Sequence, residues 1–191
     1  VVHNGIPADR FDAVTVAEAA NTRRALAPNA ACVIAAVSRL APWKGQHVVI
    51  AATQSLPDVH AWIIGAPLFG EDDYAAKLRA QVKGLEVTDR VQVLGERHDV
   101  PALLRAADIV VHSAVDAEPF GRVVVEGMLS RRPVIATAAG GVREIIRDGE
   151  TGLLVAPGDP IALADAIRRV RAMPTALRDA MVQRAYDDAV S

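Results

Sequence analysis

Two glutamates, Glu118 and Glu126, lie eight residues apart in the segment Glu-Pro-Phe-Gly-Arg-Val-Val-Val-Glu. Glu126 stands in an otherwise apolar run, where a carboxylate is costly unless something binds it. A helix that begins near Gly121 would turn its free N–H groups toward the space beside Glu118, where an anion is favoured. Eight residues of helix rise by about 12 Å, close to the span between the hexose and the ribose of a nucleotide sugar. The pair therefore predicts a site that holds a sugar nucleotide at both ends.

Two cations, Arg39 and Lys44, lie five residues apart in a loop that leads into a helix. A diphosphate needs fixed positive donors: a guanidinium can bind it through two hydrogen bonds, and an ammonium acts as a point charge. The helix start near Gly45 would add backbone donors. For this segment alone, two ordinary surface cations are an equal alternative. Paired carboxylates also suit glycoside hydrolysis, but that reaction does not need the two cations.

Other segments are weaker candidates. Gly65 ends a predicted strand, and Gly140 and Gly141 allow close backbone approach before a helix, although plain turn chemistry explains the glycine pair equally well. Arg97 is a candidate contact near the nucleotide base, with a surface turn as the alternative. His112 is expected to pack at the end of a strand. The acids that begin at Glu71 fit a helix start, and no metal site is predicted.

Short β-branched runs alternate with helical patterns, which is typical of βαβ units and a parallel sheet. The near-continuous apolarity of the runs suits strands that are covered on both faces. The predicted strands are 33–38, 61–65, 90–95, 108–113, 133–137 and 152–155. The predicted helices are 44–55, 74–84, 100–107, 121–131, 142–147, 160–173 and 176–190. The pattern predicts an α/β fold: a Rossmann-like, doubly wound sheet of about six parallel strands with helices on both faces.

The candidate site residues follow these strands, and the carboxyl ends of parallel strands are where ligands bind in such sheets. Their convergence on one edge is a stronger argument than any single motif. Residues 8–30 are polar and rich in alanine, so 1–30 is predicted to be an entry turn and linker, and 31–191 the ligand-binding domain. The chain opens without Met on a strand-like segment that ends in Asn4-Gly5, and we interpret it as a fragment cut at a domain boundary.

Composition excludes several classes of protein. The chain has 191 residues, of which 51% are hydrophobic, and this is enough to bury the core of one domain. The net charge is −2 without a basic block, which argues against nucleic-acid binding. Cys32 is the only cysteine, so a disulfide framework and a thiolate metal site are excluded. No apolar run is long enough to span a membrane and no signal peptide opens the chain, so a cytoplasmic location is expected.

Taken in order, these segments resemble the C-terminal, donor-binding domain of retaining GT-B glycosyltransferases, specifically glycosyltransferase family 4 of the group 1 type. The resemblance covers nearly the whole chain, and the ordered set is highly specific although each piece is weak. The matching segments are His3-Asn4-Gly5-Ile6, Ser38-Arg39, Lys44-Gly45, Gly65, Val93-Leu94-Gly95, Ala107-Asp108-Ile109, Glu118-Pro-Phe-Gly121, Glu126, Pro133-Val134-Ile135-Ala136, Gly140-Gly141, Glu144, Asp148-Gly149 and Thr151-Gly152-Leu153.

The resemblance implies roles for individual residues. Arg39 and Lys44 would hold the donor diphosphate and offset the charge of the leaving group. Glu118 would contact hydroxyls of the donor sugar, and these three are the implied catalytic residues. The backbone at Phe120-Gly121 would contact sugar and phosphate, and Glu126 would bind the ribose hydroxyls. Because the family uses no divalent ion and favours front-face transfer with retention, stabilising the departing diphosphate would be the main contribution of the protein.

The resemblance also implies a hexosyltransferase without a cofactor, whose donor is a UDP-, GDP- or ADP-linked sugar. An N-terminal domain outside this chain would bind the acceptor, so the fragment alone is expected to be inactive. The full-length protein would be cytoplasmic or peripheral at the inner face of the membrane. The alternatives are a nucleotide-sugar epimerase of the same architecture and a non-catalytic nucleotide-sugar-binding module. A dehydrogenase is excluded because no Gly-x-Gly-x-x-Gly turn follows the first strand.

The chain departs from the family between Glu126 and the strand at 133. The family has Glu-Ala-Met-Ala and then a glycine, whereas this chain has Glu-Gly-Met-Leu-Ser-Arg-Arg. Gly127 is predicted to cost about 1 kcal/mol of helix stability relative to alanine. Arg132 is poorly suited to a turn with positive φ.

Overall fold

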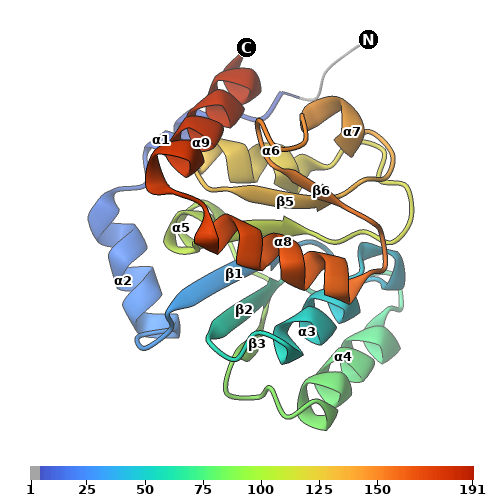
Figure 1. Cartoon of the computed structure of the whole chain (residues 1–191). Coiled ribbons are helices and arrows are strands. Elements are labelled where there is room, and N and C mark those ends of the chain that lie inside the picture. The colour runs from blue at the N-terminus through green and yellow to red at the C-terminus, as the bar shows by residue number, and fades with distance from the viewer. Residues whose placement is uncertain (1–4) are drawn as a thin grey trace.

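A single parallel sheet organises the computed structural model, which describes residues 5–191. Its strands run in the order β3-β2-β1-β4-β5-β6 (Figure 1). Their bounds are β1 Cys32–Val37, β2 Val59–Ile64, β3 Val91–Gly95, β4 Ile109–His112, β5 Val134–Thr137 and β6 Leu153–Val155. All six predicted strands and the Rossmann-like class are confirmed. The expected opening strand and the His3-Asn4 part of the family motif lie outside the described residues.

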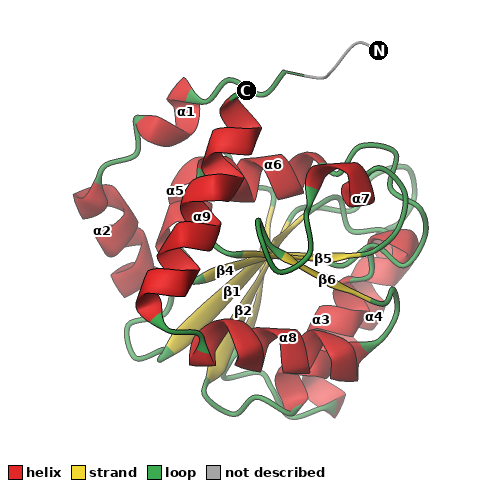
Figure 2. Cartoon of the chain, turned by 45° about the horizontal axis from the view of Figure 1, so that its top comes forward, coloured by secondary structure: helices red, strands yellow, loops and turns green. Residues whose placement is uncertain are grey.

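Helices cover both faces of the sheet (Figure 2). The bounds are α1 Asp9–Asp12, α2 Val16–Leu26, α3 Gln46–Gln54, α4 Asp72–Gly84, α5 Val100–Ala106, α6 Arg122–Leu129, α7 Val142–Ile145, α8 Pro160–Ala172 and α9 Thr175–Val190, with a 3₁₀ turn η1 at Pro42–Lys44. Alternate residues of β1 enter two cores: Ile34 packs with α3, α4 and α8, whereas Val33 packs on the face covered by the other helices. None of the helices in 5–191 is both long and apolar enough to span a membrane.

The segment 8–30, which we expected to be a linker, forms α1 and α2. Thr15 and Glu18 build a capping box at the start of α2: the Glu18 amide donates to Thr15 Oγ1 at 3.2 Å, and the Thr15 amide donates to Glu18 Oε2 at 2.8 Å. Arg23 then ties α2 to the sheet through an ion pair with Asp108 at 2.8 Å. The helix is therefore held by polar contacts at its start and its last turns, while Ala19 is its only buried residue.

Close packing explains the glycine in α6 that departs from the family pattern. A Cβ atom at Gly127 would lie 2.9 Å from Val134 Cγ2 and 3.0 Å from the Cβ of Val110. These atoms belong to buried strands β4 and β5, so they cannot move away cheaply. The helix approaches the sheet at this point because the residue has no side chain.

We therefore expect Gly127→Ala to destabilise the protein by about 1–3 kcal/mol. Helix propensity alone predicts the opposite sign, a gain of about 1 kcal/mol. Urea unfolding of the two proteins measures the difference in the free energy of unfolding. A variant that is more stable than the parent would show that α6 moves away from the sheet without cost.

The left-handed turn that ends α6 is made by Arg131, at φ 54°, rather than by Arg132. The Arg131 amide donates to Met128 O at 2.9 Å and the Arg132 amide donates to Gly127 O at 3.2 Å, the hydrogen-bond pattern of a Schellman motif. Glycine takes this conformation at lower cost. The turn therefore lies one residue earlier than we expected, and an arginine takes the left-handed conformation there.

Candidate functional site

The order of the strands places a topological switch point between β1 and β4, where ligands bind in doubly wound sheets. A cleft of about 230 Å³ opens there at the carboxyl ends of these two strands. We call it the switch-point cleft. Its lining residues are Ala36, Val37, Ser38, Lys44, Val111, His112, Ser113, Glu118, Gly121, Arg122, Val123 and Glu126. Four of the predicted site residues therefore share one cavity: Lys44, Glu118, Gly121 and Glu126.

The turn η1 delivers Lys44 to this cleft. The Lys44 carbonyl accepts a hydrogen bond from Ser113 Oγ at 2.9 Å, and the Trp43 carbonyl accepts one from the amide of Val115 at 2.8 Å. The loop after β4 thus holds the loop after β1. The ammonium of Lys44 lies 4.0 Å from the ring centroid of Trp43, a cation–π contact that fixes its direction.

Glu118 lies on the loop between β4 and α6 and accepts a charge-assisted hydrogen bond from Lys44 Nζ. Nε2 of the buried His112 lies 3.6 Å from the same carboxylate oxygen, and Nδ1 of that imidazole is 3.2 Å from Thr137 Oγ1. Burial raises the pKa of Glu118, but the imidazole and the ammonium outweigh it and lower the pKa to about 2. The carboxylate of Glu118 is thus ionised throughout the neutral range.

Glu126 has a different environment on the first turns of α6. Its side chain is 17% exposed, and Arg122, at 3.8 Å, is its partner in an i,i+4 ion pair. Burial raises the pKa of Glu126, and the charges of Arg122 and Arg10 only partly offset this. The carboxylate is therefore short of donors, as expected for a group that would accept hydrogen bonds from a ligand.

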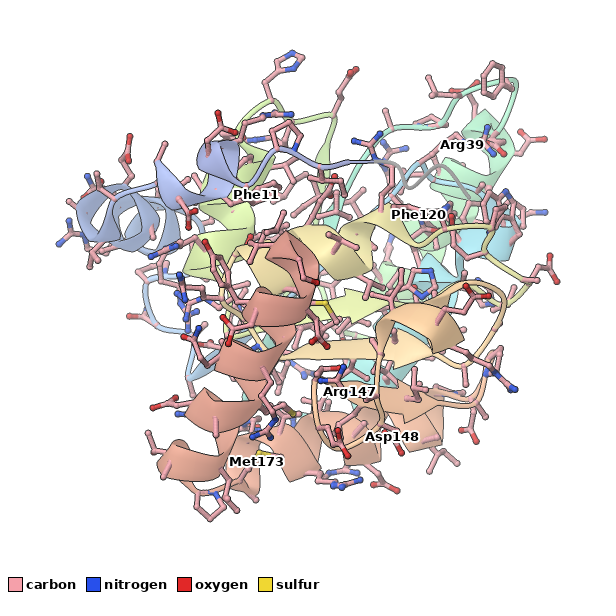
Figure 3. All side chains as sticks on the ribbon, turned by 90° about the horizontal axis from the view of Figure 1, so that it is seen from above. Phe11, Arg39, Phe120, Arg147, Asp148 and Met173 are labelled. Carbon is pink, nitrogen blue, oxygen red and sulfur yellow. The ribbon has the colours of Figure 1, made fainter. Side chains whose placement is uncertain are left out.

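Arg39 does not line the switch-point cleft. Its guanidinium turns toward the segment between β2 and α4, where Nε lies 3.3 Å from Glu71 Oε2. It also lies 5.1 Å from the ring centroid of Phe69 and 5.9 Å from that of Trp43. Figure 3 shows Arg39 on the same side of the molecule as Phe120. We expected Arg39 and Lys44 to face one diphosphate; in this structure each is paired with its own carboxylate instead.

The remaining predicted residues lie around the cleft. The side chain of Phe120 lines a separate hollow with Ile6, Met128 and the end of α9. Arg97, on the loop after β3, makes a two-pronged ion pair with Asp99 at 2.8 and 2.6 Å. Gly65 and Gly141 pack against backbone: a Cβ atom would lie 1.9 Å from Ser38 O and 2.5 Å from Pro119 O, respectively.

Gly140 supports Glu118 from behind. The two residues form a parallel β-bridge, and the Gly141 amide donates to Glu118 O at 2.9 Å. Gly140 has φ 64°, and a Cβ atom there would lie 2.2 Å from the Glu118 carbonyl oxygen. Its position therefore follows from the packing of the two loops. This packing requires glycine whether or not the backbone also touches a ligand.

Three residues of the site have contacts that were not predicted from the sequence. His112 packs at a strand end as expected, but it also touches Glu118. Glu71 was explained as a helix-start acid, and it pairs with Arg39. Arg122 lines the cleft beside Glu126 and had no assigned role. Its position one residue after Gly121, at the predicted start of α6, was the available signal. No group of His, Cys, Asp and Glu suited to a metal ion occurs within 5–191.

Fold and cleft together define a C-terminal, donor-binding domain of GT-B architecture. The family model "Glycosyl transferases group 1" matches residues 19–188. The chain therefore belongs to the group 1 glycosyltransferase family, and the resemblance seen in the sequence is confirmed.

Individual relatives agree. LpsE, the lipopolysaccharide core biosynthesis glycosyltransferase of Rhizobium meliloti (strain 1021), is 32% identical over 163 residues, 85% of this chain and 46% of LpsE. HepE of Anabaena, in a crystal structure with UDP-glucose, is 37% identical with a TM-score of 0.94 over 99% of this chain and 52% of HepE. The C-terminal domain of LpcC from Francisella tularensis has 27% identity and a TM-score of 0.82 over 97% of both chains. The chain thus spans about half the length of LpsE and HepE.

Proposed function

We propose that this chain binds the nucleotide sugar for a glycosyltransferase that transfers the sugar to an acceptor with retention, without a metal ion. The observation that carries the proposal is the switch-point cleft, in which Lys44, Glu118 and Glu126 meet at the carboxyl ends of β1 and β4. The HepE structure holds UDP-glucose on the same fold, which supports a diphosphonucleotide donor here.

In this proposal Lys44 is the principal partner of the diphosphate. Its ammonium is already bonded to Glu118, so the incoming phosphate adds a second anion to a fixed cation. Glu118 stays ionised and accepts hydrogen bonds from hydroxyls of the donor sugar, while His112 Nε2 lies 3.6 Å from the carboxylate. As the bond from sugar to phosphate breaks, charge grows on the diphosphate. A preorganised ammonium stabilises that charge more than it stabilises the ground state.

Arg39 has a second role to take up in this proposal. In this structure Arg39 pairs with the carboxylate of Glu71. A phosphate oxygen is an equally good acceptor for a guanidinium, so a bound diphosphate could replace Glu71 as its partner. A rotation of the Arg39 side chain away from Glu71 would bring it toward the diphosphate. The substrate classes that we propose are a hexose donor linked to UDP, GDP or ADP, and an acceptor bound by a domain outside this chain.

Calorimetric titration with UDP, GDP, ADP and their sugars tests the binding function. We expect one base to bind at micromolar to millimolar concentration and Glu126→Gln to weaken it. Glu126→Gln keeps the shape of the side chain and removes the charge that ribose hydroxyls would bind. If none of these nucleotides bound at millimolar concentration, the proposed function would be wrong.

The raised pKa of Glu126 predicts how nucleotide affinity depends on pH. Only the ionised carboxylate accepts two ribose hydroxyls, so affinity should fall as the pH is lowered toward the raised pKa of Glu126. Glu118, with a pKa of about 2, does not titrate in that range. Calorimetry between pH 7 and 5 should show proton uptake by Glu126 competing with binding.

The matched control is Glu126→Gln, which keeps every other titrating group, including the phosphate of the nucleotide itself. Its affinity should change less with pH than that of the parent. With a 2′-deoxynucleotide, which lacks one ribose hydroxyl, the difference in affinity between the parent and Glu126→Gln should also be smaller. Parallel pH curves for the parent and Glu126→Gln would show that this carboxylate does not bind the ribose.

A further inference from the structure

A second polar hollow lies at the opposite edge of the sheet, where β4 and β5 begin. It has a volume of about 220 Å³ and is enclosed by the ends of α6 and α8 and the first turns of α9. Figure 3 shows Met173, between α8 and α9, on the side of the view opposite to Arg39. Its charged lining residues are Arg131, Arg132, Arg171, Arg178, Asp108 and Asp179. We call it the basal hollow.

Two of these charged groups are already neutralised by residues outside the hollow. Asp108 accepts from Arg23 at 2.8 Å and from the amide of Val33 at 2.7 Å. Arg171 forms a two-pronged ion pair with Asp58. Three arginines then face one carboxylate, that of Asp179. The hollow is thus cationic in a chain whose net charge is −2.

Arg132 is the most deeply placed of the three. Its Nε is buried without a hydrogen-bond partner, and Nη1 of the neighbouring Arg105 is buried without one as well. The one hydrogen bond of the Arg132 side chain is donated by its Nη2 to the carbonyl of Arg105. Burial lowers the pKa of Arg132; Asp108 counteracts this, and the charges of Arg105 and Arg23 add to it. Arg132 is thus a partly buried guanidinium with an unused donor and cationic neighbours, and it lacks an acceptor.

The other two arginines are held at the rim of the hollow. The guanidinium of Arg131 stacks 3.6 Å from the ring centroid of Tyr186, and its Nη1 donates to Gln183 Oε1 at 3.2 Å. Arg131 keeps this place in spite of its left-handed backbone. Arg178 projects from the first turns of α9 and is partly exposed. Positively charged donors therefore line the basal hollow both at its rim and deeper inside.

We propose that the basal hollow is an oxyanion site for a phosphate group. Several guanidinium groups can bind the oxygens of one phosphate through paired hydrogen bonds, and a phosphate supplies more acceptors and more charge than a carboxylate. The hollow is separate from the switch-point cleft, so the proposal does not depend on the nucleotide. The phosphate comes either from solution or from a lipid headgroup, and the experiment distinguishes these sources.

Inorganic phosphate is the first probe, titrated against the protein at constant ionic strength with chloride as the reference anion. The readout is the set of arginine Nε–H resonances in nitrogen-15 spectra, since these report each guanidinium separately from the switch-point cleft. We expect phosphate to shift the signals of Arg132 and Arg178. Arg132→Gln should weaken the binding seen at Arg178 by about tenfold or more, the loss expected for one charge-assisted contact.

Matched variants keep the test decisive. Arg79→Gln removes an exposed arginine from α4, which contributes no residue to the basal hollow, and should leave phosphate binding there unchanged. If Arg132→Gln failed to fold, Arg178→Gln at the rim would replace it, with a several-fold loss expected. Phosphate that shifts neither Arg132 nor Arg178, or that binds both hollow variants as tightly as the parent, would overturn a site for free phosphate.

Vesicles identify the source of the phosphate. Flotation with phosphatidic acid in phosphatidylcholine, compared with phosphatidylcholine alone, supports a lipid headgroup if binding requires the acidic lipid and is lost in Arg178→Gln. Binding of inorganic phosphate without flotation supports a phosphate from solution. If neither inorganic phosphate nor acidic vesicles bound through these arginines, the proposal would be wrong.

Discussion

Replacing Lys44 by methionine in the full-length enzyme should lower kcat/KM for sugar transfer by about 100- to 1,000-fold, the loss seen when one preorganised charge-stabilising donor is removed. The reason is the position of the ammonium: it lies in the switch-point cleft, fixed by Glu118 and the Trp43 ring. Methionine keeps the length and packing of the side chain and removes the charge. The effect should fall mainly on kcat, because charge on the diphosphate grows in the transition state.

Lys83→Met is the matched control, since this lysine is exposed at the end of α4. It should transfer sugar at the rate of the parent. Lys44→Met also leaves the buried Glu118 without its ammonium partner, so the variant must first be shown to be folded by circular dichroism. A folded Lys44→Met enzyme with kcat/KM within twofold of the parent would remove Lys44 from the mechanism.

Gly140→Ala, which adds only one methyl group, should lower the free energy of unfolding by about 3 kcal/mol. Two costs add together. An L-residue is strained at φ 64°, and the new Cβ atom would lie 2.2 Å from the carbonyl oxygen of Glu118. The loop must move, and with it the backbone bridge that supports Glu118. We therefore expect Gly140→Ala to lower both the free energy of unfolding in urea and the affinity for nucleotide.

Gly84→Ala provides the matched substitution at the end of α4, where no atom lies within 4 Å of the added Cβ. It should be neutral or stabilising by up to about 1 kcal/mol, because alanine loses less backbone entropy on folding. Equal stability changes for the two substitutions would mean that the loop at Gly140 adapts without cost. A loss of stability with unchanged nucleotide affinity would separate the loop from the position of Glu118.

Periodicity and apolar runs were sufficient to predict the sheet. The central strands β1, β4 and β5 are buried on both faces, so they appear in the sequence as continuous apolar runs, as in 33–36. The helix α2 was not predicted, because Ala19 is its only buried residue and its hydrophobic periodicity is correspondingly weak. The capping box Thr15-x-x-Glu18 was a readable signal of its start. Helices that are held by caps and ion pairs show little hydrophobic periodicity.

The rule that ligands bind at the carboxyl ends of strands brought Lys44, Glu118 and Glu126 together correctly in one cleft. It could not predict the direction of a side chain. Arg39 follows β1 as expected, yet it turns to Glu71, which lies 32 residues further along the chain and beyond another strand. The same limit applies to His112, whose contact with Glu118 depends on the path of the loop after β4.

The sequence alone thus determined the sheet, the family and the edge at which the site lies, because these depend on the order and spacing of residue types. The tertiary structure decided which charges pair and which remain open. The pairs Lys44–Glu118 and Arg39–Glu71, and the unpaired Nε of Arg132, all depend on distances between loops and helix ends. Such distances arise from close packing, at Gly127 and Gly140 for example, where a single methyl group decides how near two segments can approach.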